Sequence, residues 1–129
     1  MIRVDTKKEV IFAVQKVGEG IITLNIDAEG ELRVIESVQD VIKLWKEGAE
    51  GKIVLAEDTG TTTLGPIMSK LAGVVCTSGA LGSHLAIVTR EFEIPALMGT
   101  VIDPSVELDR RNVVIKSEGD GKGALFISE

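Results

Sequence analysis

The sequence has very few of the residues that build disulfide frameworks or metal sites. Its 129 residues include one cysteine, Cys76, and one histidine, His84. A single cysteine cannot form an internal disulfide, and one cysteine with one histidine cannot supply the ligands of a usual zinc site. We therefore expect no metal or other cofactor bound by this chain alone, and we interpret Cys76 as a small buried core residue.

Long hydrophobic runs and excess positive charge are also absent. No apolar run approaches the roughly 18 residues of a membrane span, and the start, MIRVDTKKEV, lacks the apolar core of a signal peptide. Fourteen Lys and Arg against twenty Asp and Glu give a net charge of -6, which would repel a phosphate backbone. The sequence thus predicts a cytoplasmic protein without a membrane or nucleic-acid partner.

Aliphatic residues make up most of the apolar content. Hydrophobic residues account for 44% of the chain but aromatic ones for only 3%, and the mean hydropathy is +0.25. This composition is typical of a globular protein with an aliphatic core. A chain of this length fits one domain, 1–129, and can bury a sizeable core.

The first third of the chain reads mainly as strands. Two β-rich runs, 9–17 and 20–26, are expected to form a hairpin through 18–19. A third strand, 31–35, is expected to follow a turn at 28–30. This part of the chain therefore predicts consecutive strands joined by short turns.

The period changes in the segment SVQDVIKLWKEG. Apolar residues at helical spacing predict an amphipathic helix, with Ser37 as its N-cap and Gly48 as its stop. One face of this helix is expected to be buried, and it consists of Val38, Val41, Ile42 and Trp45.

The rest of the chain alternates buried strands with helices. The continuous apolar runs 52–56 and 73–76 are typical of strands covered on both faces. The other expected elements are a short helix from Pro66 to Leu71, a helix over 84–92, and a terminal strand pair at 112–116 and 123–128. This order predicts a mixed α/β fold.

The only histidine follows the glycine-containing stretch TSGALGS at the expected start of a helix. If Ser83 caps that helix, unpaired N–H groups and the positive end of the helix dipole lie beside the His84 ring and favour an anion. Gly79 and Gly82 permit close approach of the backbone to phosphate, and imidazole is a nucleophile that accepts phosphoryl groups. The alternative is that His84 is a hydrogen-bonded structural residue and Ser83 a plain N-cap.

Two further side chains are candidates for a supporting role. Arg90 lies six positions after His84, about 240° round the helix, so we expect it to point elsewhere and to serve in an ion pair or in docking to a partner. Thr59, in the run TGTTT, is a candidate hydroxyl contact, with a solvated turn as the alternative.

The residues around His84 resemble the mobile phosphohistidine domain, or swivelling domain, of enzymes that use phosphoenolpyruvate. Pyruvate phosphate dikinase, phosphoenolpyruvate synthase and enzyme I of the sugar phosphotransferase system belong to this group. Their signature runs approximately G-G-x-T-S-H-x-A-I-x-A-R-x-x-x-I-P-A-x-x-G. The resemblance is clearest over 52–129. The matching residues are Gly79, Ser83, His84, Ala86, Ile87, Arg90, Ile94, Pro95, Ala96 and Gly99.

The resemblance implies a layered β/β/α swivelling domain in which His84 accepts and donates the phosphoryl group, with Gly79, Gly82 and Ser83 in the phosphoryl loop. Three departures from the family pattern matter. Ala80 stands where the family has its second glycine, and Gly82 stands where it has a threonine, which removes one hydroxyl contact. Thr77 and Ser78 stand where the family often has a charged pair. A non-catalytic module that binds an anion or a partner through this loop is therefore the alternative.

The resemblance also implies partners. In these enzymes the swivelling domain carries phosphoryl groups between a nucleotide-grasping domain and a barrel, and neither fits in this chain. We expect a phosphocarrier subunit, inactive alone, that visits nucleotide-binding and phosphoenolpyruvate- or acceptor-binding subunits transiently. Those subunits would supply Mg²⁺ and nucleotide. A homo-oligomer through the N-terminal strands is left open.

Overall fold

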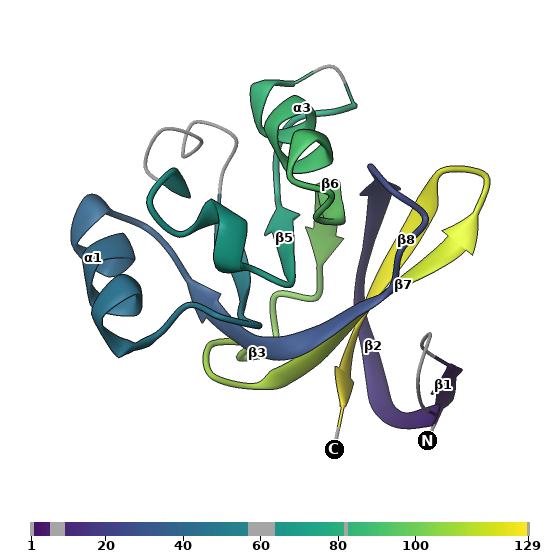
Figure 1. The fold of residues 1–129 in the computed structure, drawn as a ribbon. Coiled ribbons are helices and arrows are strands. Elements are labelled where there is room, and N and C mark those ends of the chain that lie inside the picture. The colour runs from purple at the N-terminus through teal and green to yellow at the C-terminus, as the bar shows by residue number, and fades with distance from the viewer. Residues whose placement is uncertain (1, 6–9, 57–63, 82, 129) are drawn as a thin grey trace.

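The protein consists of a strand-rich sheet with helices packed on one of its faces (Figure 1). The structure is a computed structural model that describes residues 2–5, 10–56, 64–81 and 83–128. The strands are β1 (Ile2–Asp5), β2 (Val10–Ile22), β3 (Ala28–Val34), β4 (Ile53–Ala56), β5 (Gly73–Cys76), β6 (Ala96–Ile102), β7 (Asn112–Gly119) and β8 (Lys122–Ser128). The helices are α1 (Val38–Glu47), the 3-10 helix η2 (Met68–Lys70) and α3 (His84–Glu91). The predicted mixed α/β class is confirmed.

The sheet closes on itself. Its strand order is β1-β2-β6-β5-β4-β3-β7-β8, and β2 also pairs with β8. The neighbours from β3 to β6 run parallel, whereas β2 pairs antiparallel with both β6 and β8. Closure gives the sheet an inner and an outer face, and side chains alternate between them along each strand.

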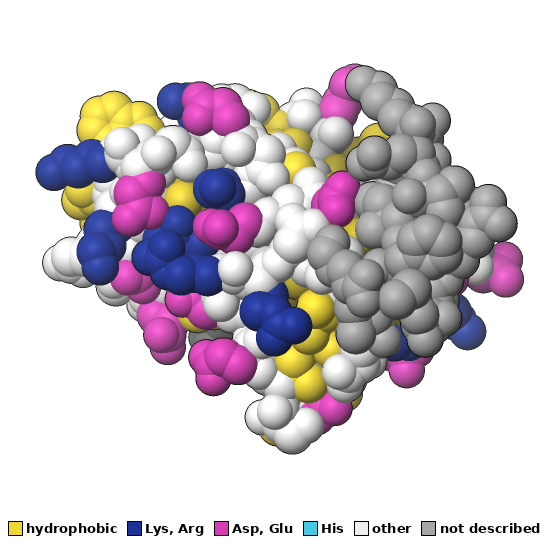
Figure 2. All heavy atoms as spheres, turned by 90° about the horizontal axis from the view of Figure 1, so that it is seen from below, with side chains coloured by type: hydrophobic (Ala, Val, Ile, Leu, Met, Phe, Trp, Pro, Cys, Tyr) yellow, Lys and Arg dark blue, Asp and Glu magenta, His cyan; other side chains and the backbone are white. Residues whose placement is uncertain are grey.

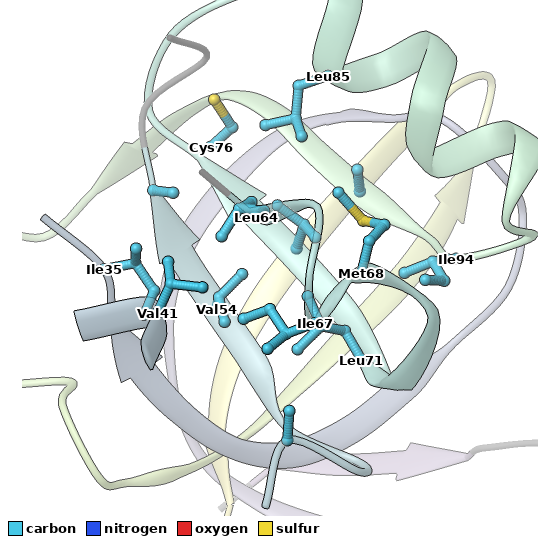
Figure 3. Close-up of a cluster of buried hydrophobic side chains, with 14 of the residues drawn as sticks. Ile35, Val41, Val54, Leu64, Ile67, Met68, Leu71, Cys76, Leu85 and Ile94 are labelled. Atoms are coloured by element: carbon cyan, nitrogen blue, oxygen red, sulfur yellow. The ribbon is translucent and has the colours of Figure 1, made fainter. Parts of the chain in front are cut away.

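The inner face is filled by one aliphatic cluster, in which Ile53 of β4 and Val75 of β5 meet Leu97 of β6 and Leu125 of β8. Alternate residues of β4, β5 and β6 face outward and form a second cluster with α1, η2 and α3. Figure 3 shows this outer core, with Val41, Val54 and Ile67 gathered under the helices and Cys76 and Leu85 at its α3 end. The parallel strands are thus covered on both faces, as their continuous apolar runs predict.

The expected hairpin through 18–19 is wrong, because β2 continues through it as a single strand of 13 residues. Gly18 and Gly20 lie against the backbone of β6, where a side chain would collide. The expected turn at 28–30 is also wrong, since these residues pair with β7 as part of β3. At Gly30 a Cβ atom would clash with the Gly51 carbonyl. In each case glycine permits close approach of two chain segments rather than a turn.

Helix α1 has the predicted caps. The Ser37 hydroxyl accepts a hydrogen bond of 3.3 Å from the Asp40 amide, and Gly48 ends the helix with a φ of 111°. The predicted buried face is correct at Val41 only. Leu44 is buried beside it, whereas Val38, Ile42 and Trp45 are 56%, 45% and 54% exposed.

An ion pair also joins α1 to the sheet. The Arg33 guanidinium of β3 donates a 2.7 Å hydrogen bond to the Glu47 carboxylate in the last turn of the helix. This bond, together with the guanidinium charge, lowers the pKa of the Glu47 carboxyl. The pair thus adds a polar contact to the burial of Val41 and Leu44 between α1 and the sheet.

The remaining elements agree with the sequence in part. The predicted strands at 52–56, 73–76, 112–116 and 123–128 correspond to β4, β5, β7 and β8, and Cys76 is buried as expected. The expected helix from Pro66 to Leu71 is reduced to the 3-10 turn η2, and β6 was not predicted. No helix in the described ranges is long and apolar enough to span a membrane.

The end of the molecule opposite α3 carries charges of both signs. Figure 2 shows Lys and Arg interspersed with Asp and Glu on this face. Among the described residues, Lys116 pairs with Asp27 at 3.1 Å and Lys52 with Glu31 at 3.7 Å.

Candidate functional site

The His84 loop begins at the carboxyl end of the central parallel strand β5. After Cys76 the chain passes through 77–83 and enters α3, which crosses back to the neighbouring parallel strand β6. Ligands of open parallel sheets typically bind at the carboxyl ends of strands, where such loops gather. In Figure 1 the start of α3 and its loop project from one end of the molecule.

Ser83 is the N-cap of α3, as predicted. Its backbone is extended, at φ −71° and ψ 158°, and its Oγ accepts a 3.4 Å hydrogen bond from the Ala86 amide. The Ser83 amide donates to the Ala80 carbonyl at 3.0 Å. The amides at this helix start are thus partly satisfied within the chain, while the Ser83 hydroxyl also carries a hydrogen that it can donate.

His84 is the first residue of α3, and its side chain is exposed. Among the residues that the structure describes, none is hydrogen-bonded to its imidazole. Leu81 and Ile87, three positions to either side, are 41% and 42% exposed. The ring therefore lies at the surface, at the helix end that carries the positive end of the dipole.

Two glycines with positive φ lie where the loop meets β6. Gly79 has a φ of 80° and Gly99, on β6, a φ of 56°. The Gly99 amide donates to the Ser78 carbonyl at 3.1 Å. A Cβ atom on Gly99 would lie 3.1 Å from the Gly79 carbonyl oxygen. Sequence reasoning noted Gly99 only as a signature match, because a contact across 20 positions leaves no local signal.

The helical position of Arg90 suggested that its side chain points away from His84. In the structure this side chain reaches the loop that precedes His84. Its Nη2 donates a 3.0 Å hydrogen bond to the carbonyl of Leu81, nine positions earlier. Side chains on a helix tilt toward its N-terminus, and a long arginine can extend back past the first turn. Arg90 thus contacts the backbone of the loop that carries His84.

The other candidates do not add to this geometry. Thr59 and Gly82 lie outside the described residues. Within the described part of the chain, no group of three or more His, Cys, Asp or Glu side chains is placed to hold a metal ion. The residues that the structure brings together are therefore Gly79, Ser83 and His84 with Arg90 and Gly99.

Comparisons with known proteins agree with this arrangement. A family model described as "PEP-utilising enzyme, mobile domain" matches residues 48–118. A phosphoenolpyruvate-dependent phosphotransferase system protein of Salmonella typhimurium is 38% identical over 97 residues, which cover 74% of this chain and 12% of the relative. A probable phosphoenolpyruvate synthase of Archaeoglobus fulgidus is 32% identical over 99 residues, or 77% of this chain and 12% of the relative.

The chain thus spans about an eighth of the length of these two relatives. Among solved structures, a MccF-like protein from Bacillus anthracis superposes on this chain with a TM-score of 0.55 and 13% identity. The superposition covers 84% of this chain and 43% of the MccF-like chain. At that identity the likeness concerns the fold alone.

Proposed function

Because this chain belongs to the mobile-domain family of phosphoenolpyruvate-utilising enzymes, we propose that it is a phosphocarrier. In this proposal His84 accepts a phosphoryl group at one active site and delivers it at another, each on a partner subunit. In this proposal the closed sheet with helices on one face is the family's layered β/β/α swivelling domain. Family membership agrees with the signature residues around His84.

The observation that carries the proposal is the position of His84. The ring is exposed at the first residue of α3 and at the carboxyl end of β5, so a donor in another subunit can reach its nitrogen. A buried or hydrogen-bonded ring could not transfer phosphate between two sites without first breaking its contacts.

The transfer requires little chemistry from this chain. The lone pair of an unprotonated ring nitrogen attacks phosphorus, the bond to the donor's leaving group breaks with its electron pair, and the ring releases its other N–H proton once the N–P bond has formed. The phosphoryl group brings about two negative charges. The helix dipole and the Ser83 hydroxyl stabilise that charge on this chain, while Mg²⁺ and nucleotide come from the partner subunits.

The proposed partners are a nucleotide-binding subunit and a subunit that binds phosphoenolpyruvate or another acceptor. A carrier that visits both must leave each quickly, so its contacts are small and transient. The exposed Leu81 and Ile87 beside His84 suit a brief, partly apolar contact at the mouth of an active site.

Intact-protein mass spectrometry tests the proposal. The protein is incubated with extract of its own cells, as the source of partner subunits, and with ATP or phosphoenolpyruvate. We expect one phosphoryl adduct that acid removes, because N–P bonds to imidazole are acid-labile. His84→Ala and His84→Gln should fold normally, since substitutions of exposed residues cost little stability, and should acquire no adduct.

Two outcomes would reject the phosphocarrier. One is a wild-type protein that never acquires the adduct with either donor, and the other is an adduct that persists in the His84 variants. The first would favour the non-catalytic module that binds an anion or a partner, in line with the signature departures at Ala80 and Gly82.

A further inference from the structure

Two elements outside the His84 loop form hydrogen bonds to the backbone of this loop. On one side is Arg90, in the last turn of α3. On the other is Gly99, in the middle of β6. We infer that Arg90 and Gly99 are positioning residues for phosphoryl transfer, which act through the loop backbone to place His84 and Ser83. This inference rests on the proposed function of His84.

The β6 side holds the start of the loop. Pairing between β5 and β6 ends with Val75 and Leu97, and the Gly99 amide then continues the contact by bonding the Ser78 carbonyl at 3.1 Å. Glycine is needed at 99 for two reasons. Its φ of 56° disfavours a side chain, and a Cβ atom would lie 3.1 Å from the Gly79 carbonyl.

The α3 side holds the end of the loop. The 3.0 Å bond from Arg90 to the Leu81 carbonyl fastens the chain three residues before His84. A charged donor makes a stronger hydrogen bond than a neutral one. Together with the bond from the Ser83 amide to the Ala80 carbonyl, it fixes the turn that leads into the helix.

These contacts matter for chemistry because the loop is otherwise exposed, from Thr77 to Leu81 among its described residues. A loosened loop lets the ring and the Ser83 hydroxyl sample many orientations. Only a few of them align the ring nitrogen, the phosphorus and the leaving group. Small misplacements of this kind can slow a reaction by up to about 100-fold.

Phosphoramidate, a small donor that needs no partner subunit, provides the assay. Its N–P bond breaks and ammonia leaves as the ring nitrogen of His84 forms the new N–P bond. The rate is measured against donor concentration by intact mass, with N-acetylhistidine as the reference for an unassisted imidazole. High salt screens any general attraction of the Arg90 charge for the anionic donor.

The variants are paired with controls that share their chemistry. Arg90→Met is compared with Arg111→Met, which removes an exposed arginine outside the loop. Arg90→Lys keeps a charged donor. Gly99→Ala is compared with Gly121→Ala, because Gly121 also has positive φ, at 75°, but nothing within 4 Å of its Cβ position.

We expect Arg90→Met and Gly99→Ala to lower the maximal rate about tenfold or more, toward that of N-acetylhistidine, with a smaller change in half-saturating donor concentration. Arg90→Lys should recover part of the rate, and both controls should match the wild type. Amide hydrogen exchange in 77–81 should become faster in Arg90→Met and Gly99→Ala only. The melting temperatures of the arginine variants should equal that of the wild type.

The inference is overturned if the wild type reacts well above the rate of N-acetylhistidine and both Arg90→Met and Gly99→Ala react as fast as the wild type. Unchanged exchange of the loop amides in these variants would overturn it equally. A wild-type rate no higher than that of N-acetylhistidine would instead count against the proposed function itself, and the exchange data would still report whether the two residues hold the loop.

Discussion

Gly20 on β2 and Met98 on β6 lie so close together that a Cβ atom on Gly20 would be 2.6 Å from the Met98 carbonyl oxygen. Both atoms belong to the main chain or are fixed to it, so no flexible side chain can move aside to relieve the contact. This approach lets β2 pair with β6 and β8 at once, and so it closes the sheet.

We therefore expect Gly20→Ala to destabilise the protein by about 1–3 kcal/mol, because overpacking forces the backbone to shift. Gly18→Ala should cost less, since its Cβ would be 3.1 Å from the Val101 carbonyl. Urea unfolding of both variants measures the difference. Equal stabilities would show that this strand contact is looser than the structure has it.

Neighbouring residues of α1 should differ in their contribution to stability. Leu44 is 1% exposed and Trp45 is 54% exposed. Leu44→Ala should cost about 2–5 kcal/mol through lost burial and a cavity. Trp45→Ala should stay within about 0.5 kcal/mol, as substitutions at exposed sites usually do. Chemical denaturation tests this, and a larger loss for Trp45→Ala would mean that α1 buries its other face.

The two serine caps allow a separation of stability from chemistry. Ser37 and Ser83 each accept a hydrogen bond from an amide in the first turn, at 3.3 Å and 3.4 Å. Ser37→Ala and Ser83→Ala should each cost about 0.5–2 kcal/mol. Only Ser83→Ala should also slow phosphorylation of His84, because its hydroxyl lies at the helix start that carries His84.

Ser83→Asp adds a further control for this prediction. Aspartate caps a helix as well as serine does, but its charge would repel the incoming phosphoryl group. Thermal melting should therefore remain near that of the wild type while the rate of adduct formation falls. A Ser83→Asp protein that transfers at the wild-type rate would place the phosphoryl group away from this cap.

The sequence by itself determined the elements whose signals are local. Ser37 and Ser83 mark helix starts because a cap bonds an amide only three residues away, and Gly48 marks a helix end through its own backbone angle. The short apolar runs of β4 and β5 predict strands that are buried on both faces. The exposed histidine at a capped helix start, and the family to which it points, follow from the same local pattern.

Only the tertiary structure decided the features that depend on distant parts of the chain. A glycine looks the same in sequence whether it makes a turn or lets a neighbouring backbone come close. Gly18 and Glu19 therefore suggested a hairpin where β2 continues. The buried face of α1 depends on how the helix packs on the sheet, and the two contacts on the His84 loop come from Arg90 and Gly99. Each of these contacts joins segments that only folding brings together. Local sequence preferences therefore cannot predict them.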